Sequence, residues 1–282
     1  MHPYRYVDAH GTACVKAEAL LGKGCFGATY RMRHRHDGML RAVKQVPKTK
    51  ACTKEVETIA RLPPHCNVVG YFGCRRSRKG HLWIVMELVG EGETLSVTKH
   101  YPRRRALLAD VAQGLAHIHA HNMVHRDIKC DNIFVRAGGA VVGDFGHATG
   151  ELDELALYTP RPGVVGRGHW VYRAPEILAG TAYGAAADMW SLGIICLEFA
   201  VGMTATAMLL GTPCQDVGAW LQTIEGKETV EDLLADATEP GGLPILSSLL
   251  LRRTPEKRPT ARAFRAGCQG QEKTGKTRPV SA

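Results

Sequence analysis

The chain has 282 residues, of which 45% are hydrophobic and 22% are charged. This composition supplies a sizeable core for one globular unit of one or two lobes, and it excludes a chain that is disordered throughout. The net charge of +9 comes from short separate basic runs such as Arg103 to Arg105, so nucleic-acid binding is not favoured.

Cysteine usage and apolar runs indicate the setting of the protein. The nine cysteines are an odd number without a C-x-x-C pair, which predicts a reducing, intracellular compartment, cytoplasmic or nuclear. Residues 1–14 contain no apolar stretch of the kind found in secretory signals and are predicted to be an N-terminal extension. The longest apolar run, Met189 to Leu210, contains Glu198, so we predict a buried helix there and no membrane span.

Residues 15–89 have the pattern of a small sheet with one helix. A helix is predicted over Thr53–Leu62, which carries spaced apolar residues and ends at two prolines. A polar turn is predicted over Cys74–Gly80. The predicted strands, the first with a glycine-rich turn inside it, are Ala19–Tyr30, Met39–Gln45, Val68–Phe72 and His81–Glu87.

From residue 90 onward the pattern becomes helical. Arg104–Ala120 carries apolar residues at helical spacing, and Val89–Thr94 before it is predicted to be a hinge. Further helices are predicted around 188–203, 216–225 and 243–252. The expected fold class is therefore α+β, with an N-lobe over 15–89, a C-lobe over 90–266 and a disordered tail over 267–282.

The segment Gly22-Lys23-Gly24-Cys25-Phe26-Gly27 predicts a phosphate-binding turn. Glycines let backbone N–H groups approach phosphate oxygens closely. A dinucleotide-binding turn has the same three-glycine spacing, but it opens a helix. Strand-type residues follow Gly27, so the sequence favours a β-hairpin over phosphates.

Three polar residues with the chemistry of phosphoryl transfer lie within twenty positions. Asp127 and Asn132 belong to the segment 124–134, and Asp144 belongs to the Asp-Phe-Gly segment at 143–146. Such a reaction needs one carboxylate to accept the proton of the attacking hydroxyl, and further oxygen ligands to hold Mg²⁺ against the phosphates.

These segments resemble those of the eukaryotic-type protein kinases, and the resemblance runs from residue 20 to residue 260. It implies a bilobal fold with a small antiparallel sheet in the N-lobe. The catalytic loop is similar to those of p21-activated and MAP-kinase-cascade kinases, which are serine/threonine-specific. The segments that carry the resemblance are Gly22–Gly27, Ala42–Lys44, Val124–Phe134, Gly143–Gly146, Tyr172–Glu176, Asp188–Gly193 and Pro255–Thr260.

The resemblance implies a role for each catalytic position. Asp127 would be the catalytic base, and Lys129 would contact the transferring phosphate. Asn132 and Asp144 would hold Mg²⁺. Lys44 would neutralise the α- and β-phosphates of ATP.

An acidic partner of Lys44 is expected on the predicted helix 53–62, where both Glu55 and Glu57 are available. Matching Leu62 to the junction between helix and strand in kinases selects Glu55. The interval from Lys44 to Glu55 is shorter than kinases usually have, so we expect a truncated or tilted helix.

The adenine and ribose sites are implied in the same way. Met86 would be the gatekeeper, the carbonyl of Glu87 and the N–H of Val89 would bind the adenine, and Glu93 would contact ribose or substrate. Thr29 stands where kinases usually have a valine, which predicts weaker ATP binding. The remaining implied ATP-binding residues are Leu21, Gly22, Lys23, Gly24, Cys25, Phe26, Gly27, Ala42 and Phe134.

Other positions concern regulation and stability. His169 replaces a threonine that kinases of this type usually have. Valines occupy 164–165, where a phosphate acceptor usually lies, and Thr159 is displaced, so we expect weak dependence on phosphorylation of the segment. Glu176 and Arg258 would form a buried ion pair. The histidines at 117, 119 and 121 alternate on a helix, which does not favour a metal site.

The expected function is transfer of the γ-phosphate of Mg·ATP to serine or threonine of protein substrates. The carboxylates of Asp131, beside Asn132, and of Glu93, in the predicted hinge, predict substrates with basic residues near the acceptor. The alternatives are an ATP-binding pseudokinase scaffold, suggested by His169 and Thr29, and a small-molecule kinase. The latter should lack the Ala-Pro-Glu segment and its Arg258 partner.

Overall fold

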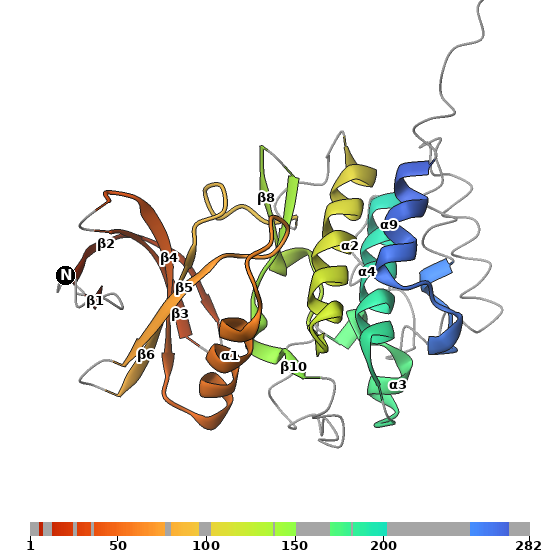
Figure 1. Ribbon diagram of the computed structural model, residues 1–282, viewed down its shortest axis with the longest axis horizontal. Coiled ribbons are helices and arrows are strands. Elements are labelled where there is room, and N and C mark those ends of the chain that lie inside the picture. Colours follow the sequence, from red (N-terminus) through yellow and green to blue (C-terminus); the bar gives the residue numbers. More distant parts are fainter. Residues whose placement is uncertain are drawn as a thin grey trace, which may run out of the picture.

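The computed structural model describes most of the chain. Figure 1 shows a strand-rich lobe at the N-terminal side and a helical lobe at the C-terminal side. The described residues are 6–7, 13–24, 27–34, 37–76, 80–95, 103–137, 139–150, 170–181, 183–201 and 249–270.

The N-lobe is a six-stranded antiparallel sheet in the order β1-β2-β3-β4-β6-β5. The hairpin and the strands predicted around Lys44 and Met86 are confirmed. The strands are β1 (Tyr6–Val7), β2 (Ala13–Gly24), β3 (Gly27–Arg33), β4 (Leu40–Pro47), β5 (Tyr71–Arg76) and β6 (His81–Glu87).

The predicted strand Val68–Phe72 is misplaced. β5 begins at Tyr71 and continues to Arg76, into the residues predicted to form a turn. Val68 and Val69 are buried, but Val68 bridges Val142 and the N–H of Val69 donates to the Val142 carbonyl at 2.9 Å. Their apolar character therefore reflects contact with the other lobe and not membership of the sheet.

Helix α1 (Lys50–Arg61) packs beside the sheet and begins three residues earlier than predicted. It ends before two prolines, which cannot continue a helix. One side of the sheet buries Met32, Val43, Trp83 and Val85, and a second cluster contains Val46, Leu82 and Ile84 with Val56 of α1 packed against it. This alternation follows from the two-residue period of a strand.

The C-lobe is built on three helices, and α2 packs against both of the others (Figure 1). Helix α2 (Arg104–Ala120) has the predicted bounds, because Leu108, Val111 and Leu115 form a fully buried stripe. The others are α4 (Ala185–Val201) and α9 (Ala261–Gly270), with the short α3 (Pro175–Leu178).

The apolar run that begins at Met189 is the core of this lobe. Met189, Trp190, Leu192 and Ile195 are at most 1% exposed. No helix within the described ranges is long and apolar enough to cross a membrane.

The helices and the tail predicted for the C-terminal part of the chain lie only partly within the described residues. Residues 216–225 and most of 243–252 lie outside the described residues, although Leu249 and Leu250 are helical. Helix α9 runs to Gly270 and so includes the first residues of the predicted tail, and residues 271–282 lie outside the described residues.

Short strands and turns lie between the lobes (Figure 1). β8 (Ile133–Arg136) pairs with β9 (Gly139–Val142), and β7 (Met123–Val124) pairs with β10 (Thr149–Gly150). One apolar cluster includes Ile59, Val68 and Val69 of the N-lobe together with residues of α2, β9 and α9. The two lobes therefore share a core beneath the polar residues singled out above.

Candidate active site

Three charged groups from three elements meet at the junction of the lobes. The ammonium of Lys44 on β4 lies 2.7 Å from Glu55 Oε1 on α1 and 2.8 Å from Asp144 Oδ1. Lys44 and Glu55 are buried, whereas the Asp144 side chain is 38% exposed. Glu55, and not Glu57, is thus the partner of Lys44.

The charges of this cluster stabilise one another. Burial disfavours the charged form of Lys44, but Asp144 and Glu55 outweigh it and hold the pKa of Lys44 above its ordinary range. Burial likewise opposes ionisation of Asp144, yet Lys44 keeps the pKa of Asp144 below its usual value. Burial raises the pKa of Glu55, with Lys44 acting in the opposite direction.

The short interval between Lys44 and Glu55 does not prevent their contact. β4 ends at Pro47 and α1 begins at Lys50, so a link of only residues 48–49 joins them. Glu55 and Ile59 are four positions apart and both are buried on one face of α1. The short link between β4 and α1 therefore accounts for the short interval, and Glu55 still reaches Lys44.

The segment after β7 carries the second group of polar residues. The side-chain amide of Asn132 donates to two oxygens of Asp127, the backbone carbonyl oxygen and Oδ2, both at 2.8 Å. Lys129 Nζ lies 3.1 Å from the same Oδ2. Asn132 and Lys129 are buried and so hold the Asp127 carboxylate in one orientation.

Asp188, at the start of α4, holds the backbone of this loop through its carboxylate. Its Oδ2 accepts from the N–H of His125 at 2.9 Å, and its Oδ1 accepts from the N–H of Arg126 at 2.8 Å. His119 Nε2 lies 2.9 Å from Oδ2. Although Asp188 is fully buried, these contacts keep its pKa below the ordinary value.

One contact of Asp188 holds a strained residue, because Arg126 has a φ of 66°, a conformation that side chains other than glycine rarely adopt. Asp144 also has a positive φ, 59°, and its Oδ1 accepts from the N–H of Gly146 at 3.3 Å. No role beyond its motif was predicted for Asp188, because a buried carboxylate that binds backbone N–H groups has no local sequence pattern.

Asn132 and Asp144 supply oxygen ligands of the type that Mg²⁺ prefers. The N–H of Gly143 donates to the Asn132 carbonyl at 2.9 Å, which links the two segments directly beside Asp144. No group of three or more His, Cys, Asp and Glu that could hold a metal occurs in the described part of the chain. A small set of oxygen ligands fits an ion that is bound largely by phosphates and water.

The glycine-rich segment is a hairpin, which excludes the dinucleotide-binding alternative. Gly24 pairs with Gly27 across the turn, whereas Cys25 and Phe26 lie outside the described residues. Gly27 has a φ of 144°, and a Cβ there would overlap the carbonyl oxygen of Gln45. Leu21, Gly22 and Lys23 are on β2.

The sheet places the predicted nucleotide-binding residues on one face. Thr29 pairs with Lys44, and Ala42 pairs with Met86, so these four side chains project to the same side. Thr29 therefore adds a hydroxyl to this face, as predicted from its position. The predicted weakening of ATP binding stays a prediction.

The predicted hinge lies beside β8. Thr94 bridges Phe134, the N–H of Val135 donates to the Glu93 carbonyl at 3.0 Å, and Val89 is buried. Glu87 ends β6 immediately before the hinge. The structure thus brings Met86, Glu87, Val89, Glu93 and Phe134 to one region.

Glu176 and Arg258 form a buried ion pair with two parallel contacts. Nη1 of Arg258 lies 2.6 Å from Glu176 Oε1, and Nη2 of Arg258 lies 2.9 Å from Glu176 Oε2. Arg258 also donates to the carbonyl of Ala186 and lies over the Trp190 ring, 5.1 Å from its centroid. The pair attaches the Ala-Pro-Glu segment to the C-lobe.

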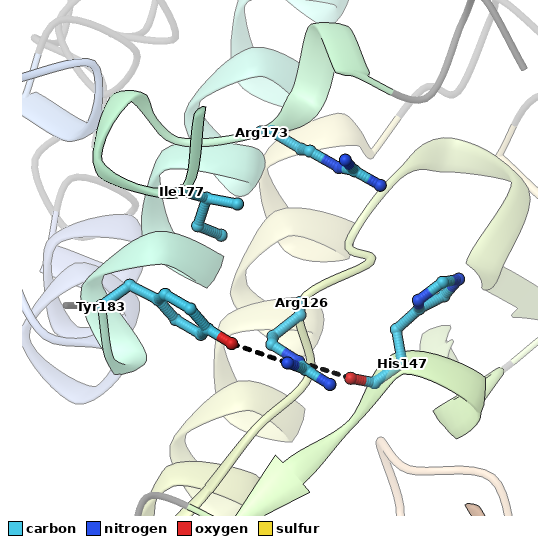
Figure 2. A pocket seen from close by; sticks show the side chains of 5 residues that line it. All are labelled: Arg126, His147, Arg173, Ile177 and Tyr183. Atoms are coloured by element: carbon cyan, nitrogen blue, oxygen red, sulfur yellow. Dashed lines mark hydrogen bonds between the residues drawn. The ribbon is translucent and has the colours of Figure 1, made fainter. Parts of the chain in front are cut away.

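Figure 2 shows a pocket beside the catalytic loop that the sequence did not predict. Arg126 donates to the carbonyl of His147 and, at 2.6 Å, to the hydroxyl of Tyr183. Arg173 and Ile177 complete the lining. Burial lowers the pKa of His147, although Asp127 and Asp144 oppose the effect.

Two guanidinium groups make this pocket attractive to an anion. The predictions made for His169, Thr159 and residues 164–165 concern positions that lie outside the described residues.

The three alternating histidines contact different groups. His119 binds Asp188, His117 Nε2 lies 2.8 Å from the Pro63 carbonyl, and His121 Nδ1 lies 2.8 Å from the His117 carbonyl. Of the three, His117 is the one that holds the backbone between α1 and β5 to α2.

His65 must be neutral in this arrangement. Its Nδ1 accepts from the N–H of Asn67 at 3.1 Å, and its ring stacks on His117 at 4.6 Å between centroids. Burial, His117 and Arg265 hold the pKa of His65 below its usual value. The folded chain therefore binds this proton less readily than the unfolded chain does.

His65 is therefore expected to contribute to the free energy of unfolding in a pH-dependent way. The contribution is complete above the pKa that His65 has in the unfolded chain, and it is lost as the pH falls below that value. In His65→Gln the amide oxygen can still accept from Asn67 but does not titrate. Urea unfolding at about pH 7.5 and about pH 5 should show a smaller loss of stability for the variant than for the wild type. Equal losses would contradict the assignment.

Comparison with known proteins agrees with this architecture. The family profile described as protein kinase domain matches residues 15–266, and the chain belongs to the protein kinase family. It is 34% identical over 194 residues to the serine/threonine-protein kinase cst-1 of Caenorhabditis elegans, covering 64% of this chain and 37% of that protein. It is 33% identical over 205 residues to myosin-IIIb of Mus musculus, covering 64% of this chain and 15% of that protein.

The chain thus spans well under half the length of either relative. It is a protein kinase with the bilobal α+β fold.

Proposed function

We propose that this protein kinase transfers the γ-phosphate of Mg·ATP to serine and threonine hydroxyls of protein substrates. The observation that carries the proposal is the Lys44–Glu55–Asp144 cluster next to the loop in which Asn132 and Lys129 orient Asp127. All six groups of the expected catalytic set are present together. A pseudokinase scaffold would not need this set.

Each residue has a definite task in the proposed reaction. Asp127 accepts the proton of the substrate hydroxyl as its oxygen attacks the γ-phosphorus and ADP leaves. Lys44, fixed by Glu55, binds the α- and β-phosphates, and Lys129 neutralises charge on the transferring group. Asp144 and Asn132 would hold Mg²⁺, which supplies further neutralisation of the phosphate oxygens when bound.

The choice of serine and threonine is supported by Lys129. It is buried beside Asp127, where its ammonium can approach the phosphate during transfer. The relative from Caenorhabditis elegans is described as a serine/threonine-protein kinase. The proposed setting is a reducing compartment inside the cell, because the sequence has an odd number of cysteines, nine, without a C-x-x-C pair.

The test is incubation with Mg·ATP labelled at the γ-phosphate and a basic acceptor protein, followed by analysis of the phosphorylated amino acids. Label on serine or threonine is expected. Tight ATP binding without transfer would favour the scaffold alternative, and label on tyrosine alone would contradict the specificity.

We also propose a preference for basic residues near the acceptor. Asp131 and Glu93 are both exposed, Asp131 next to Asn132 in the catalytic loop and Glu93 in the hinge. Relative rates on matched peptides with and without arginine should converge in Asp131→Asn/Glu93→Gln. If the ratio is the same as in the wild type, these carboxylates do not select the substrate.

A further inference from the structure

A cluster of side-chain contacts holds the start of the hinge to the C-lobe side of the site. Arg136, at the end of β8, donates from Nη1 to Glu87 Oε1 at 2.8 Å and from Nη2 to the Cys66 carbonyl at 2.6 Å. The other carboxylate oxygen of Glu87 accepts from the N–H of Gly70 at 3.2 Å. We call these four residues the hinge clasp.

The clasp joins three segments that are distant in sequence. Cys66 and Gly70 lie between α1 and β5, Glu87 ends β6, and Arg136 ends β8. Glu87 and Gly70 are also joined through their backbones, because the N–H of Glu87 donates to the Gly70 carbonyl at 2.8 Å. Arg136 is therefore the member that connects this backbone pair to β8.

The far half of the hinge is held in a different way. The carbonyl of Glu93 accepts from Val135 at 3.0 Å, and the N–H of Leu95 donates to Ile133 at 2.9 Å. At Gly90, which has a φ of 54°, a Cβ would lie 2.7 Å from the Val135 carbonyl oxygen. Backbone hydrogen bonds thus hold the hinge to β8 at Glu93 and Leu95, and Gly90 approaches β8 closely, whereas Glu87 is tied to β8 through a side chain.

We propose that Arg136 is a positioning residue for the adenine of ATP, acting through Glu87. The inference depends on the proposed function and on the adenine contacts that the kinase resemblance implies, namely the carbonyl of Glu87 and the N–H of Val89. A guanidinium binds a carboxylate and a carbonyl at once in a fixed plane, so it sets the direction of Glu87 as well as its distance from β8.

The expected effect is moderate, because both partners are partly exposed. The side chains of Arg136 and Glu87 are 35% and 33% exposed, and water screens such a pair. Removing the clasp should weaken adenine binding about three- to tenfold.

The central experiment measures the dissociation constants of ATP and of adenosine for Arg136→Met, which keeps the apolar stem but removes both contacts. Both constants should rise by the same factor, with kcat changed less than about twofold, since the phosphate-binding residues are untouched. Arg136→Lys keeps the charge without the planar fork and should lie between Arg136→Met and the wild type.

Two controls separate this role from general effects. Arg105 on α2 also joins two separate segments, because it donates to the carbonyls of Cys268 at 2.8 Å and Gly267 at 2.9 Å on α9 of the C-lobe. Arg105→Met should leave both dissociation constants unchanged. Lys44→Met should weaken ATP binding while leaving adenosine binding unchanged.

The outcomes are distinct. Unchanged adenosine affinity in Arg136→Met overturns the proposal, as does a change in kcat alone. If Arg136→Met unfolds, Glu87→Gln breaks the same charged contact and should show the same matched rise. A wild type that binds neither ATP nor adenosine would refute the proposed function itself, which is a different result.

Discussion

Asp127→Asn is expected to lower phosphotransfer by about 10²–10⁴-fold while ATP affinity stays within about twofold of the wild type. Asparagine has nearly the same shape as aspartate, so Asn132 and Lys129 keep a partner for their contacts. An amide, however, cannot accept the proton of the substrate hydroxyl. The loss should therefore fall on kcat and not on the binding of the nucleotide.

Asp131→Asn is the matched control for this change. It removes the same charge four residues further along the same loop, at an exposed position. On an acceptor peptide without arginine it should retain most of the activity. Single-turnover rates with saturating Mg·ATP measure the effect directly, and an Asp127→Asn protein with more than a tenth of wild-type activity would exclude Asp127 as the base.

Arg258→Met should be among the most destabilising single substitutions in the chain, with a loss of about 3–5 kcal/mol in the free energy of unfolding. The substitution leaves the Glu176 carboxylate buried, since Glu176 is only 7% exposed and loses two short contacts. For a domain of this size the thermal midpoint should fall by on the order of 10 °C. Thermal and urea unfolding, each checked for reversibility, provide the measurement.

A double variant distinguishes a lost ion pair from a lost packing contact. In Glu176→Gln/Arg258→Met no buried charge remains, so part of the stability should return relative to Arg258→Met. If the double variant is less stable than the single one, the cost of Arg258→Met comes from the contacts of Arg258 with Ala186 and Trp190 and not from the unpaired carboxylate.

Local patterns in the sequence were enough to predict several parts of the fold. Helix α2 has the predicted bounds because its apolar stripe repeats with the helical period along its length. The β2–β3 hairpin was predicted from strand-type residues on both sides of the glycines. In each case the decisive contacts lie within or next to the element.

The misplaced strand shows where such patterns fail. Val68 and Val69 are as apolar as strand residues, but they pack across the boundary between the lobes. Burial against a distant segment and burial within a sheet give the same run of letters. The contact of Val68 and Val69 with Val142, and not their local pattern, determines where these two residues lie.

Polar positioning residues were missed for a related reason. Arg136, Tyr183 and Asp188 act on backbone or side-chain groups at least 49 positions away in the sequence. No periodicity marks such contacts, because each depends on the meeting of two separate segments. The kinase resemblance assigned the proposed catalytic roles from motifs, whereas the residues that contact those groups became visible only in three dimensions.

The apolar cluster that runs from Ile59 to Cys268 has a consequence for how the protein denatures. Since α1, α2, β9 and α9 contribute to the same interior, neither lobe can lose its structure without exposing the apolar surface of the other. Heat should therefore melt both lobes in one cooperative transition. Expressed alone, the strand-rich half would present Val68 and Val69 to water, and it is expected to aggregate.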